Sequence, residues 1–272
     1  GISVLYMLIW KKFIRTETKF IIFNSVLSRL LNVHKQSSIK FKILVWILRE
    51  VDGIVFLAQI DLKNVASRLP FLKEKLFIVH MGVDKDYYKF ICHGREDFLL
   101  SVGRDDARDY KTVIDVAKKM PMEKFHLVCL PRNIQHIQDI PPNVHIHVNI
   151  SINELQDFYG KAKALLLITH KDTYSEGSDS SGPTVLLEAM ASGLPIIASK
   201  KEYLNDYVEH EKDVLLVDFY DSDAIVNGIR TISKGDMGLN MAKNARLKVD
   251  TSLNTEEMAH KLARVFKIIH EK

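Results

Sequence analysis

Short runs of apolar residues alternate along the chain with longer stretches in which apolar residues recur at the helical period. In the first third of the chain this pattern predicts strands at residues 20–23, 54–57 and 76–79, separated by helices at residues 38–50 and 61–69. Strands that alternate with helices in this way favour a parallel sheet with helices packed on its faces.

The alternation continues beyond a polar, loop-like stretch at residues 90–96, where we place a domain boundary. The strands expected in this second part are residues 98–102, 125–130, 144–148, 164–168, 195–198 and 214–217. The helices expected there are residues 110–119, 152–162, 184–191, 222–232 and 255–269. We therefore predict an α/β fold with two Rossmann-like, doubly wound domains, residues 1–93 and 94–272, of which the first is short or incomplete. The last helix is a candidate for packing back onto the first domain.

Composition and charge narrow the class of protein. With 47% hydrophobic and 26% charged residues, the chain of 272 residues is neither disordered nor fibrous. Its two cysteines, Cys92 and Cys129, exclude a disulfide scaffold and a cysteine-rich zinc site, and they favour a reducing compartment. Residues 1–48 carry eight Lys or Arg and one acid, Glu17, so this segment has a charge of +7 and the rest of the chain −3. The basic segment is either a surface for anionic lipid or another polyanion, or a solvated helix face.

We expect no membrane-spanning segment in this sequence. Residues 1–10 are apolar, but Lys11 and Lys12 end the run at about half of the ~20 residues that a spanning helix needs. The same segment lacks the leading positive charge and the small-residue cleavage site of a secretory signal. We expect a cytoplasmic protein, with peripheral contact at the inner face of a membrane left open.

The most informative segment is residues 175–199, in which Gly182 and Pro183 begin a predicted helix. Proline is tolerated at the first helical position because its missing N–H would be unpaired there. The remaining orphan N–H groups and the positive end of the helix dipole make such a tip a binding site for phosphate. The hydroxyls of Ser180, Ser181 and Thr184 add further donors.

Glu188 is the acid of this predicted helix. It follows Thr184 by four residues, so it lies on the same helix face about one turn deeper. Its helical neighbours are apolar, so an unpaired carboxylate there would be costly. A helix with phosphate at its tip and a carboxylate one turn down can hold a nucleotide along its length, with the carboxylate accepting the ribose hydroxyls. A surface acid without a ligand is the alternative.

The stretch LLEAMASGLPIIAS, residues 186–199, resembles the signature helix and strand of the retaining, GT-B-fold nucleotide-sugar glycosyltransferases of family 4, also called the group 1 type. Four further stretches resemble that family in the same order and at similar spacing. They are residues 76–88, 99–120, 153–169 and 203–217. Each stretch alone is a weak signal, but together they are specific and cover residues 76–217.

The resemblance implies which cations act on the donor. In the family, a Gly-Arg turn and a following basic residue bind the donor diphosphate, and Gly103 and Arg104 match the turn. The following basic residue is Arg108, with Lys111 as a rival three residues on. Their charge would stabilise the leaving group as the glycosidic bond breaks, so these cations are the catalytic candidates.

The donor-binding helix matches the family except for one acid. Glu188 matches the glutamate that binds the ribose, and the turn at residues 182–184 matches the family's close backbone approach to phosphate. The glutamate eight residues earlier, which lies near the transferred sugar in the family, is Ser180 here. Glu176 and Asp179 are candidates for a displaced carboxylate from the same loop, although a loop acid is more often solvated.

Two other positions depart from the family pattern. A glycine-rich turn after the second strand of the second domain is replaced by LPRN, residues 130–133. The family's first domain often carries a histidine near the donor sugar, and its nearest counterpart here is Asn24. Gly82, in the Gly-Val-Asp of the segment between the domains, is a further candidate on the sugar side. The histidines lack metal-ligand spacing, so we expect neither a metal nor a cofactor.

The resemblance therefore implies a glycosyltransferase of hexosyltransferase type, which moves a sugar from a nucleotide-diphosphate donor to an acceptor hydroxyl with retention of configuration. We expect a glycan or lipid-linked acceptor in cell-surface glycan or glycolipid synthesis, and no nucleic-acid partner. A nucleotide-sugar epimerase of similar architecture and a non-catalytic nucleotide-binding protein are the alternatives. A dehydrogenase is disfavoured because no G-x-G-x-x-G follows a predicted strand.

Overall fold

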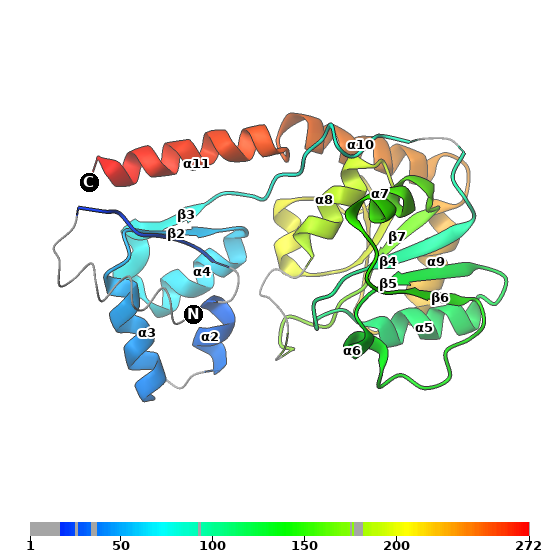
Figure 1. Ribbon diagram of the computed structural model, residues 1–272, viewed down its shortest axis with the longest axis horizontal. Helices are drawn as coiled ribbons and strands as arrows, with labels where there is room; N and C mark the ends of the chain where they lie inside the picture. The colour runs from blue at the N-terminus through cyan, green and yellow to red at the C-terminus, as the bar shows by residue number, and fades with distance from the viewer. Residues whose placement is uncertain are drawn as a thin grey trace. The chain divides into compact units, whose positions relative to one another are not determined.

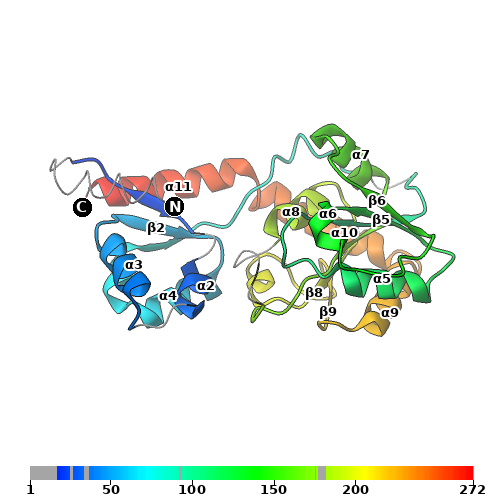
Figure 2. The ribbon, with the colours of Figure 1, turned by 60° about the horizontal axis from the view of Figure 1, so that its bottom comes forward.

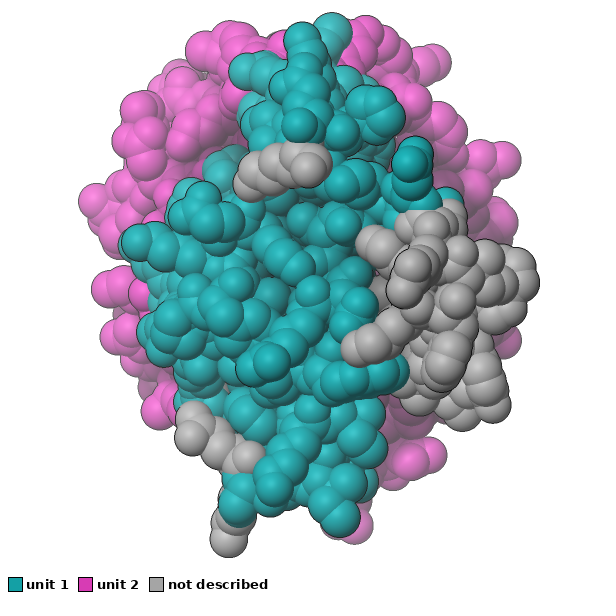
Figure 3. All heavy atoms as spheres, turned by 90° about the vertical axis from the view of Figure 1, so that its left-hand side faces the viewer, with its two compact units in different colours: residues 1–80, 178–180, 258–272 teal, residues 81–177, 181–257 magenta. Residues whose placement is uncertain are grey.

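The computed structural model describes residues 17–24, 27–33, 37–91, 94–174, 176 and 182–271. The chain forms two compact units, drawn in teal and magenta in Figure 3. Unit 1 comprises Gly1–His80, Ser178–Ser180 and Met258–Lys272, and unit 2 comprises Met81–Gly177 and Ser181–Glu257. The first division therefore falls at His80, earlier than the composition shift near residue 93.

The segment from residue 81 to residue 91 belongs to unit 2 through its backbone hydrogen bonds. The Val83 amide donates to the Leu253 carbonyl over 3.0 Å, and the Thr255 amide donates to the Val83 carbonyl over 3.1 Å. The Ile91 amide donates to the Ser192 carbonyl over 3.3 Å. These partners are far away in the sequence, so a local change in composition does not reveal them.

Unit 1 contains a parallel sheet of strand order β1-β2-β3, formed by Ile21–Phe23, Gly53–Phe56 and Leu76–Ile78. One face packs on the helices α2, Leu27–Val33, α3, Ile39–Arg49, and α4, Gln59–Arg68, while the 3-10 helix η1, Pro70–Lys75, leads into β3 (Figure 1). The opposite face packs on the long C-terminal helix α11, Thr255–His270, whose residues from Met258 onward belong to unit 1.

Unit 2 contains a parallel sheet of strand order β6-β5-β4-β7-β8-β9. The strands are β4, Phe98–Val102, β5, Lys124–Val128, β6, Val144–His147, β7, Ala164–Leu167, β8, Ile196–Ser199, and β9, Leu215–Val217. Each strand is short, and in every strand except the edge strand β6 most residues are buried, because helices cover both faces of the sheet.

The helices of unit 2 divide between the two faces of its sheet (Figures 1 and 2). One face packs on α5, Tyr110–Lys119, and α9, Ser222–Ile232. The other face carries α7, Ile152–Lys161, α8, Pro183–Ala191, and α10, Met237–Thr251. The short helix α6, Pro131–Ile134, follows β5, and the 3-10 helix η2, Glu202–Asp206, follows β8.

The strand order of unit 2 reverses between β4 and β7. The chain runs outward from β4 through β5 to β6, and then outward again from β7 through β8 to β9. The loops that leave the carboxyl ends of β4 and β7 therefore diverge, and open α/β sheets bind ligands in the crevice at such a switch point. The segments at this switch point are residues 103–109, which follow β4, and the loop that follows β7 and precedes α8.

The predicted fold class is confirmed, since every predicted strand is present within a residue or two of its expected bounds. The sequence analysis missed α2, α6 and α10. In α10 the buried residues are mainly Met241, Ala242, Ala245 and Val249, which present too few large apolar side chains to mark a helix by pattern. Among the described residues, no helix combines the length and the hydropathy that crossing a bilayer requires.

Candidate functional site

Arg108 lies at the centre of the switch point of unit 2. Its side chain is only 6% exposed, and its guanidinium packs between the backbones of Gly103, just after β4, and Gly182, at the start of α8. A Cβ atom at Gly182 would lie 2.8 Å from Arg108 Nη1, and a Cβ atom at Gly103 would clash with Arg108 Nε. Both glycines are therefore needed to admit this side chain.

The guanidinium of Arg108 is buried without satisfying all of its donors. Within the described residues, Nε and Nη1 have no hydrogen-bond partner. Leaving a buried charged donor unpaired is destabilising, so such a group in a folded protein calls for a ligand. The ligand must be an acceptor, and because guanidinium carries a positive charge in all conditions of interest, an anion fits best.

The N-terminus of α8 presents further donors next to this guanidinium. Gly182 is the N-cap residue, with a φ of 113°, and within the described residues no side chain caps the helix there. Pro183 occupies the first turn and has no N–H, so the amides that follow it in this turn are the donors that have no partner within the helix itself. The helix dipole adds positive potential at the same point. The predicted phosphate-binding turn and the predicted cation Arg108 are thus brought together.

The other two predicted cations differ from Arg108 in burial. Arg104 is exposed, and its carbonyl accepts a hydrogen bond from Arg132 Nη2 over 3.0 Å. Lys111, in the first turn of α5, is exposed, and its Nζ lies 2.5 Å from Asp115 Oδ2. The sequence leaves Arg108 and Lys111 as alternatives for the basic residue that follows the Gly-Arg turn. The structure favours Arg108, because its side chain is buried between two glycines.

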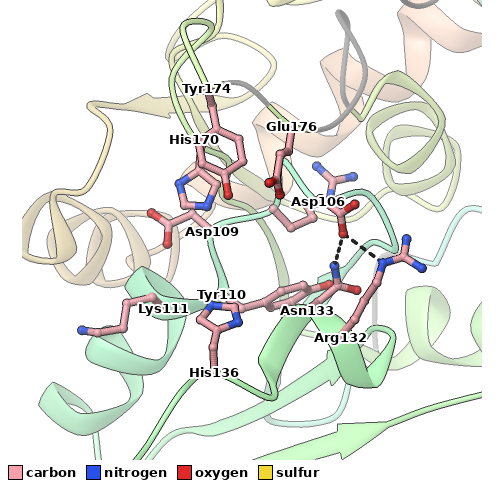
Figure 4. A pocket seen from close by; sticks show the side chains of 11 residues that line it. Asp106, Asp109, Tyr110, Lys111, Arg132, Asn133, His136, His170, Tyr174 and Glu176 are labelled. Carbon is pink, nitrogen blue, oxygen red and sulfur yellow. Dashed lines mark hydrogen bonds and ion pairs between the residues drawn. The ribbon is translucent and has the colours of Figure 1, made fainter.

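A cavity of about 300 Å³ opens beside Arg108 at the carboxyl edge of the sheet (Figure 4). Its walls come from the loops after β4, β5 and β7 and from the start of α5. The lining residues are Asp106, Arg108, Asp109, Tyr110, Lys111, Arg132, Asn133, His136, His170, Tyr174 and Glu176. All belong to unit 2. Cations, acids and two imidazoles share this lining, which suits a polar ligand that carries both charge and hydroxyl groups.

Several of the lining groups hold the cavity in shape. Asp109 is buried and caps α5 by accepting from the Thr112 amide over 3.0 Å. The Tyr110 hydroxyl donates to the Gly103 carbonyl over 2.7 Å and so fixes the turn after β4. Asp106 accepts from Arg132 Nε over 3.0 Å (Figure 4).

Glu176 and His170 are two lining groups that can exchange hydrogen bonds with hydroxyl groups of a ligand. Glu176 comes from the loop after β7, and its carboxylate turns toward the cavity in Figure 4. The His170 ring stacks on Tyr174 with centroids 4.2 Å apart, and burial lowers its pKa. Neutral imidazole offers one donor and one acceptor, so it can bond a hydroxyl group in either direction.

Glu188 lies one and a half turns into α8 and is held by two tyrosines. Its Oε1 accepts from the Tyr88 hydroxyl and its Oε2 from the Tyr159 hydroxyl, each over 2.8 Å. Burial raises the pKa of Glu188, and the two hydrogen bonds oppose that rise. Burial together with the Glu188 charge raises the pKa of both phenols, so they remain donors. Glu188 is half-buried, and each carboxylate oxygen retains a second lone pair.

Two arginines position the elements that carry this group of side chains. Arg95 donates to six main-chain carbonyls at the ends of α7 and α8 and in the preceding loop, namely those of Ile91, Tyr159, Gly160, Ala162, Ser192 and Gly193. Arg246 of α10 donates from Nη1 to the carbonyls of Tyr88 and Ala191, over 2.9 and 2.5 Å. They fix the helix ends and the loop from which Glu188 and both tyrosines project.

The remaining predicted residues lie elsewhere or outside the described part. Thr184 is exposed, and its hydroxyl donates to the Met81 sulfur over 3.3 Å. Gly82 packs on the backbone of Asn254, where any side chain would clash, so packing explains this glycine. Asn24 is buried in unit 1 and caps α2 by accepting from the Leu27 amide over 2.7 Å. Asp179, Ser180 and Ser181 lie outside the described residues.

Sequence reasoning missed the two tyrosines, the cavity residues His136, His170 and Tyr174, and the role of Arg132. Residues 130–133 were identified only as a departure from a glycine-rich turn, and in the structure Pro131 begins α6, which carries Arg132 to Asp106. Among the residues that the structure describes, no cluster of His, Cys, Asp or Glu could hold a metal ion.

Comparison with known proteins adds a family and several similar folds. Residues 91–248 match the model of the family described as glycosyl transferases group 1. HepE of Anabaena, crystallised with UDP and glucose, is 15% identical with a TM-score of 0.76, and the match covers 97% of this chain and 75% of HepE. Sucrose-phosphate synthase of Thermosynechococcus elongatus is 18% identical with a TM-score of 0.76, covering 96% of this chain and 70% of that protein.

A third similar structure is TarM, which is 17% identical with a TM-score of 0.67. The match covers 92% of this chain but 51% of TarM, so the present chain spans about half of that protein. No curated protein sequence matches the chain. At these identities the structural matches establish the fold, which is that of GT-B glycosyltransferases.

Proposed function

We propose that this chain, which belongs to the group 1 glycosyl transferase family, moves a sugar from a nucleotide-diphosphate donor to an acceptor hydroxyl with retention of configuration. The observation that carries the proposal is the buried guanidinium of Arg108, whose Nε and Nη1 have no partner among the described residues, beside the N-terminus of α8. A diphosphate supplies acceptors for both sets of donors at once. HepE has also been crystallised with UDP-glucose, which supports a donor of this class.

Catalysis in this proposal rests on stabilising the leaving group. When the bond between the sugar and the diphosphate breaks, negative charge gathers on the departing phosphate oxygens. Arg108 and the α8 amides are fixed beforehand, so they stabilise this charge without reorganising. The exposed Arg104 and Lys111 add positive charge from the same loop and from α5. Stabilisation that grows toward the transition state raises the rate rather than only the affinity.

Glu188 is proposed to bind the ribose of the donor. Its second lone pairs can accept from the two ribose hydroxyls while the tyrosines hold the carboxylate plane. On the sugar side, Glu176 is proposed to take the role of the family glutamate whose position is Ser180 in this chain. The reason is that Glu176 lines the same cavity as Arg108. No metal or cofactor is part of the proposal.

The acceptor is proposed to be a glycan or a lipid-linked molecule in cell-surface glycan or glycolipid synthesis. The basic segment of residues 1–48 supports an acceptor or a surface that carries negative charge. TarM has been crystallised with fondaparinux, α-GlcNAc-glycerol and UDP, which supports a glycan on the acceptor side. We propose that the protein works in the cytoplasm, at the inner face of the membrane.

The test is incubation of the protein with pooled nucleotide sugars, with and without EDTA, followed by mass spectrometry of protein and products. We expect one nucleotide sugar to bind and release free nucleoside diphosphate, slowly with water and faster with a suitable acceptor, and EDTA to have no effect. An epimerised donor in place of free nucleotide would point to an epimerase. No bound or converted nucleotide sugar would refute the proposal.

A further inference from the structure

The exposed face of α3 in unit 1 is composed entirely of large apolar and cationic side chains. Ile39, Ile43 and Trp46 recur at the helical spacing and are 76%, 46% and 37% exposed. The remaining exposed positions of the helix are Lys40, Lys42 and Arg49. The helix contains no acid and no neutral polar residue. A helix that merely faces water usually alternates charges of both signs on that side.

The inner side of the same helix is already occupied. Phe41 and Leu48 are buried in the core of unit 1, and Leu44, Val45 and Ile47 pack against it. Ser38 caps the helix by accepting from the Phe41 amide over 3.2 Å. These contacts fix which side of α3 faces the core of unit 1. The exposed apolar and cationic side chains therefore lie on the outer side of a helix that is already packed.

The stripe continues onto the neighbouring 3-10 helix η1. The Arg49 guanidinium lies over the Phe71 ring at 5.3 Å from its centroid, and Phe71 is itself exposed. We call the set formed by Ile39, Lys40, Lys42, Ile43, Trp46, Arg49 and Phe71 the α3 face. On the helix, its three apolar members lie together on one side, with Lys42 and Arg49 along one edge and Lys40 along the other.

We propose that the α3 face docks onto an anionic lipid surface, with α3 lying in the plane of the membrane. Ile39, Ile43 and Trp46 enter the boundary between headgroups and acyl chains, while Lys40, Lys42 and Arg49 extend outward to the lipid phosphates. Tryptophan favours this boundary because its ring is apolar and its N–H is polar. The apolar stripe of the helix is flanked by cations on both sides, which matches a continuous anionic layer better than a protein groove.

This docking would bring the enzyme to a lipid-linked acceptor, and in that respect its role rests on the proposed function. The contact itself depends on residues of unit 1 and can be measured without a donor or an acceptor. Failure of the docking would leave the donor chemistry of unit 2 untouched. Failure of the donor chemistry would equally leave vesicle binding as a separate observation.

The test is sedimentation of the full chain with vesicles of phosphatidylcholine, with and without phosphatidylglycerol. We expect binding to the anionic vesicles at least tenfold tighter than to the neutral ones, weakening as salt increases. The triple variant Ile39→Ser, Ile43→Ser, Trp46→Ser should lose most of this binding. The double variant Lys40→Gln, Lys42→Gln should lose the preference for anionic lipid. A matched control is Ile152→Ser with Leu247→Ser, which removes apolar residues of unit 2 that are 64% and 61% exposed.

A second readout locates the contact on the helix. The chain has two tryptophans, so in a Trp10→Phe background Trp46 is the sole reporter. Its emission should shift to shorter wavelength on anionic vesicles and be quenched by brominated acyl chains. The proposal is overturned if wild-type protein shows no preference for anionic vesicles, if the folded triple variant binds like wild type, or if Trp46 emission is unchanged on bound vesicles. Circular dichroism checks that the variants are folded.

Discussion

The two ends of the proposed donor site are prepared in opposite ways. At the phosphate end, Arg108 is buried with Nε and Nη1 unpaired among the described residues. At the pentose end, both carboxylate oxygens of Glu188 already accept a hydrogen bond. A buried unpaired donor costs about 1–3 kcal/mol, whereas a paired carboxylate supports the fold. Without a ligand, the phosphate end therefore lowers the free energy of unfolding, whereas the pentose end does not.

Replacing Arg108 should have the largest effect on donor binding. In Arg108→Met, which keeps much of the side-chain volume, we expect affinity for nucleoside diphosphate and for pyrophosphate to fall about 100-fold or more, because several charge-assisted hydrogen bonds are lost. The free energy of unfolding should stay the same or rise, since an unsatisfied buried charge is removed. Calorimetry and urea unfolding measure the two quantities. Unchanged pyrophosphate affinity would contradict the role of Arg108 at the phosphate end. The control is Arg230→Ala, on the exposed surface of α9.

Replacing Glu188 should give the opposite combination. In Glu188→Gln we expect nucleotide affinity to fall about tenfold and the free energy of unfolding to fall by about 1–2 kcal/mol, because one tyrosine then faces an amide donor. Affinity for pyrophosphate, which has no ribose, should be unchanged. The same two measurements apply. If pyrophosphate binding falls as far as nucleotide binding, Glu188 supports the whole site rather than the pentose end.

Removing one tyrosine hydroxyl should weaken only the pentose end. In Tyr88→Phe we expect nucleotide affinity to fall about threefold to tenfold, the equivalent of one hydrogen bond. The hydrogen bond from Tyr88 lowers the pKa of Glu188, so this pKa should be higher in the variant. As the pH falls, Glu188 should then become protonated earlier, and nucleotide affinity should begin to fall at a higher pH than in wild type. A titration from pH 8 to pH 5 at constant salt checks this. Tyr87→Phe is the control, because the Tyr87 hydroxyl bonds to Asn153.

The pH dependence of the free energy of unfolding adds a further test, because it reports on the sheet of unit 2 in the absence of a ligand. His126 stacks on Phe98 and His147, and burial together with the charges of His147 and His145 lowers its pKa to about 4. Because an unfolded histidine titrates near 6.5, stability should be full above that pH and decline as the pH falls toward 4. Urea unfolding at several pH values measures the decline, which should be smaller in His126→Gln. An identical decline in that variant would contradict the assignment.

The sequence predicts the sheet, and it also supplies the residues of the proposed phosphate end, for a physical reason. Strands, the Gly-Pro helix start and the cation near the Gly-Arg turn are local signals within a few residues of one another. The pentose end depends on Tyr88, 100 residues before Glu188, and on Tyr159, 29 residues before it. No local pattern links such partners. Gly82 illustrates a second limit of the sequence, because a glycine required by backbone packing on Asn254 has the same local signal as one required by a ligand.

Helix α11 sets the order in which the molecule can be finished during synthesis. Val265 and Ile269 cover the sheet face formed by Val55 and Val79, although the strands that carry that face leave the ribosome long before α11 does. Unit 2 lies almost wholly between these two segments of the chain. The apolar face of the first sheet therefore stays without its covering helix until α11 has been synthesised, after most of unit 2.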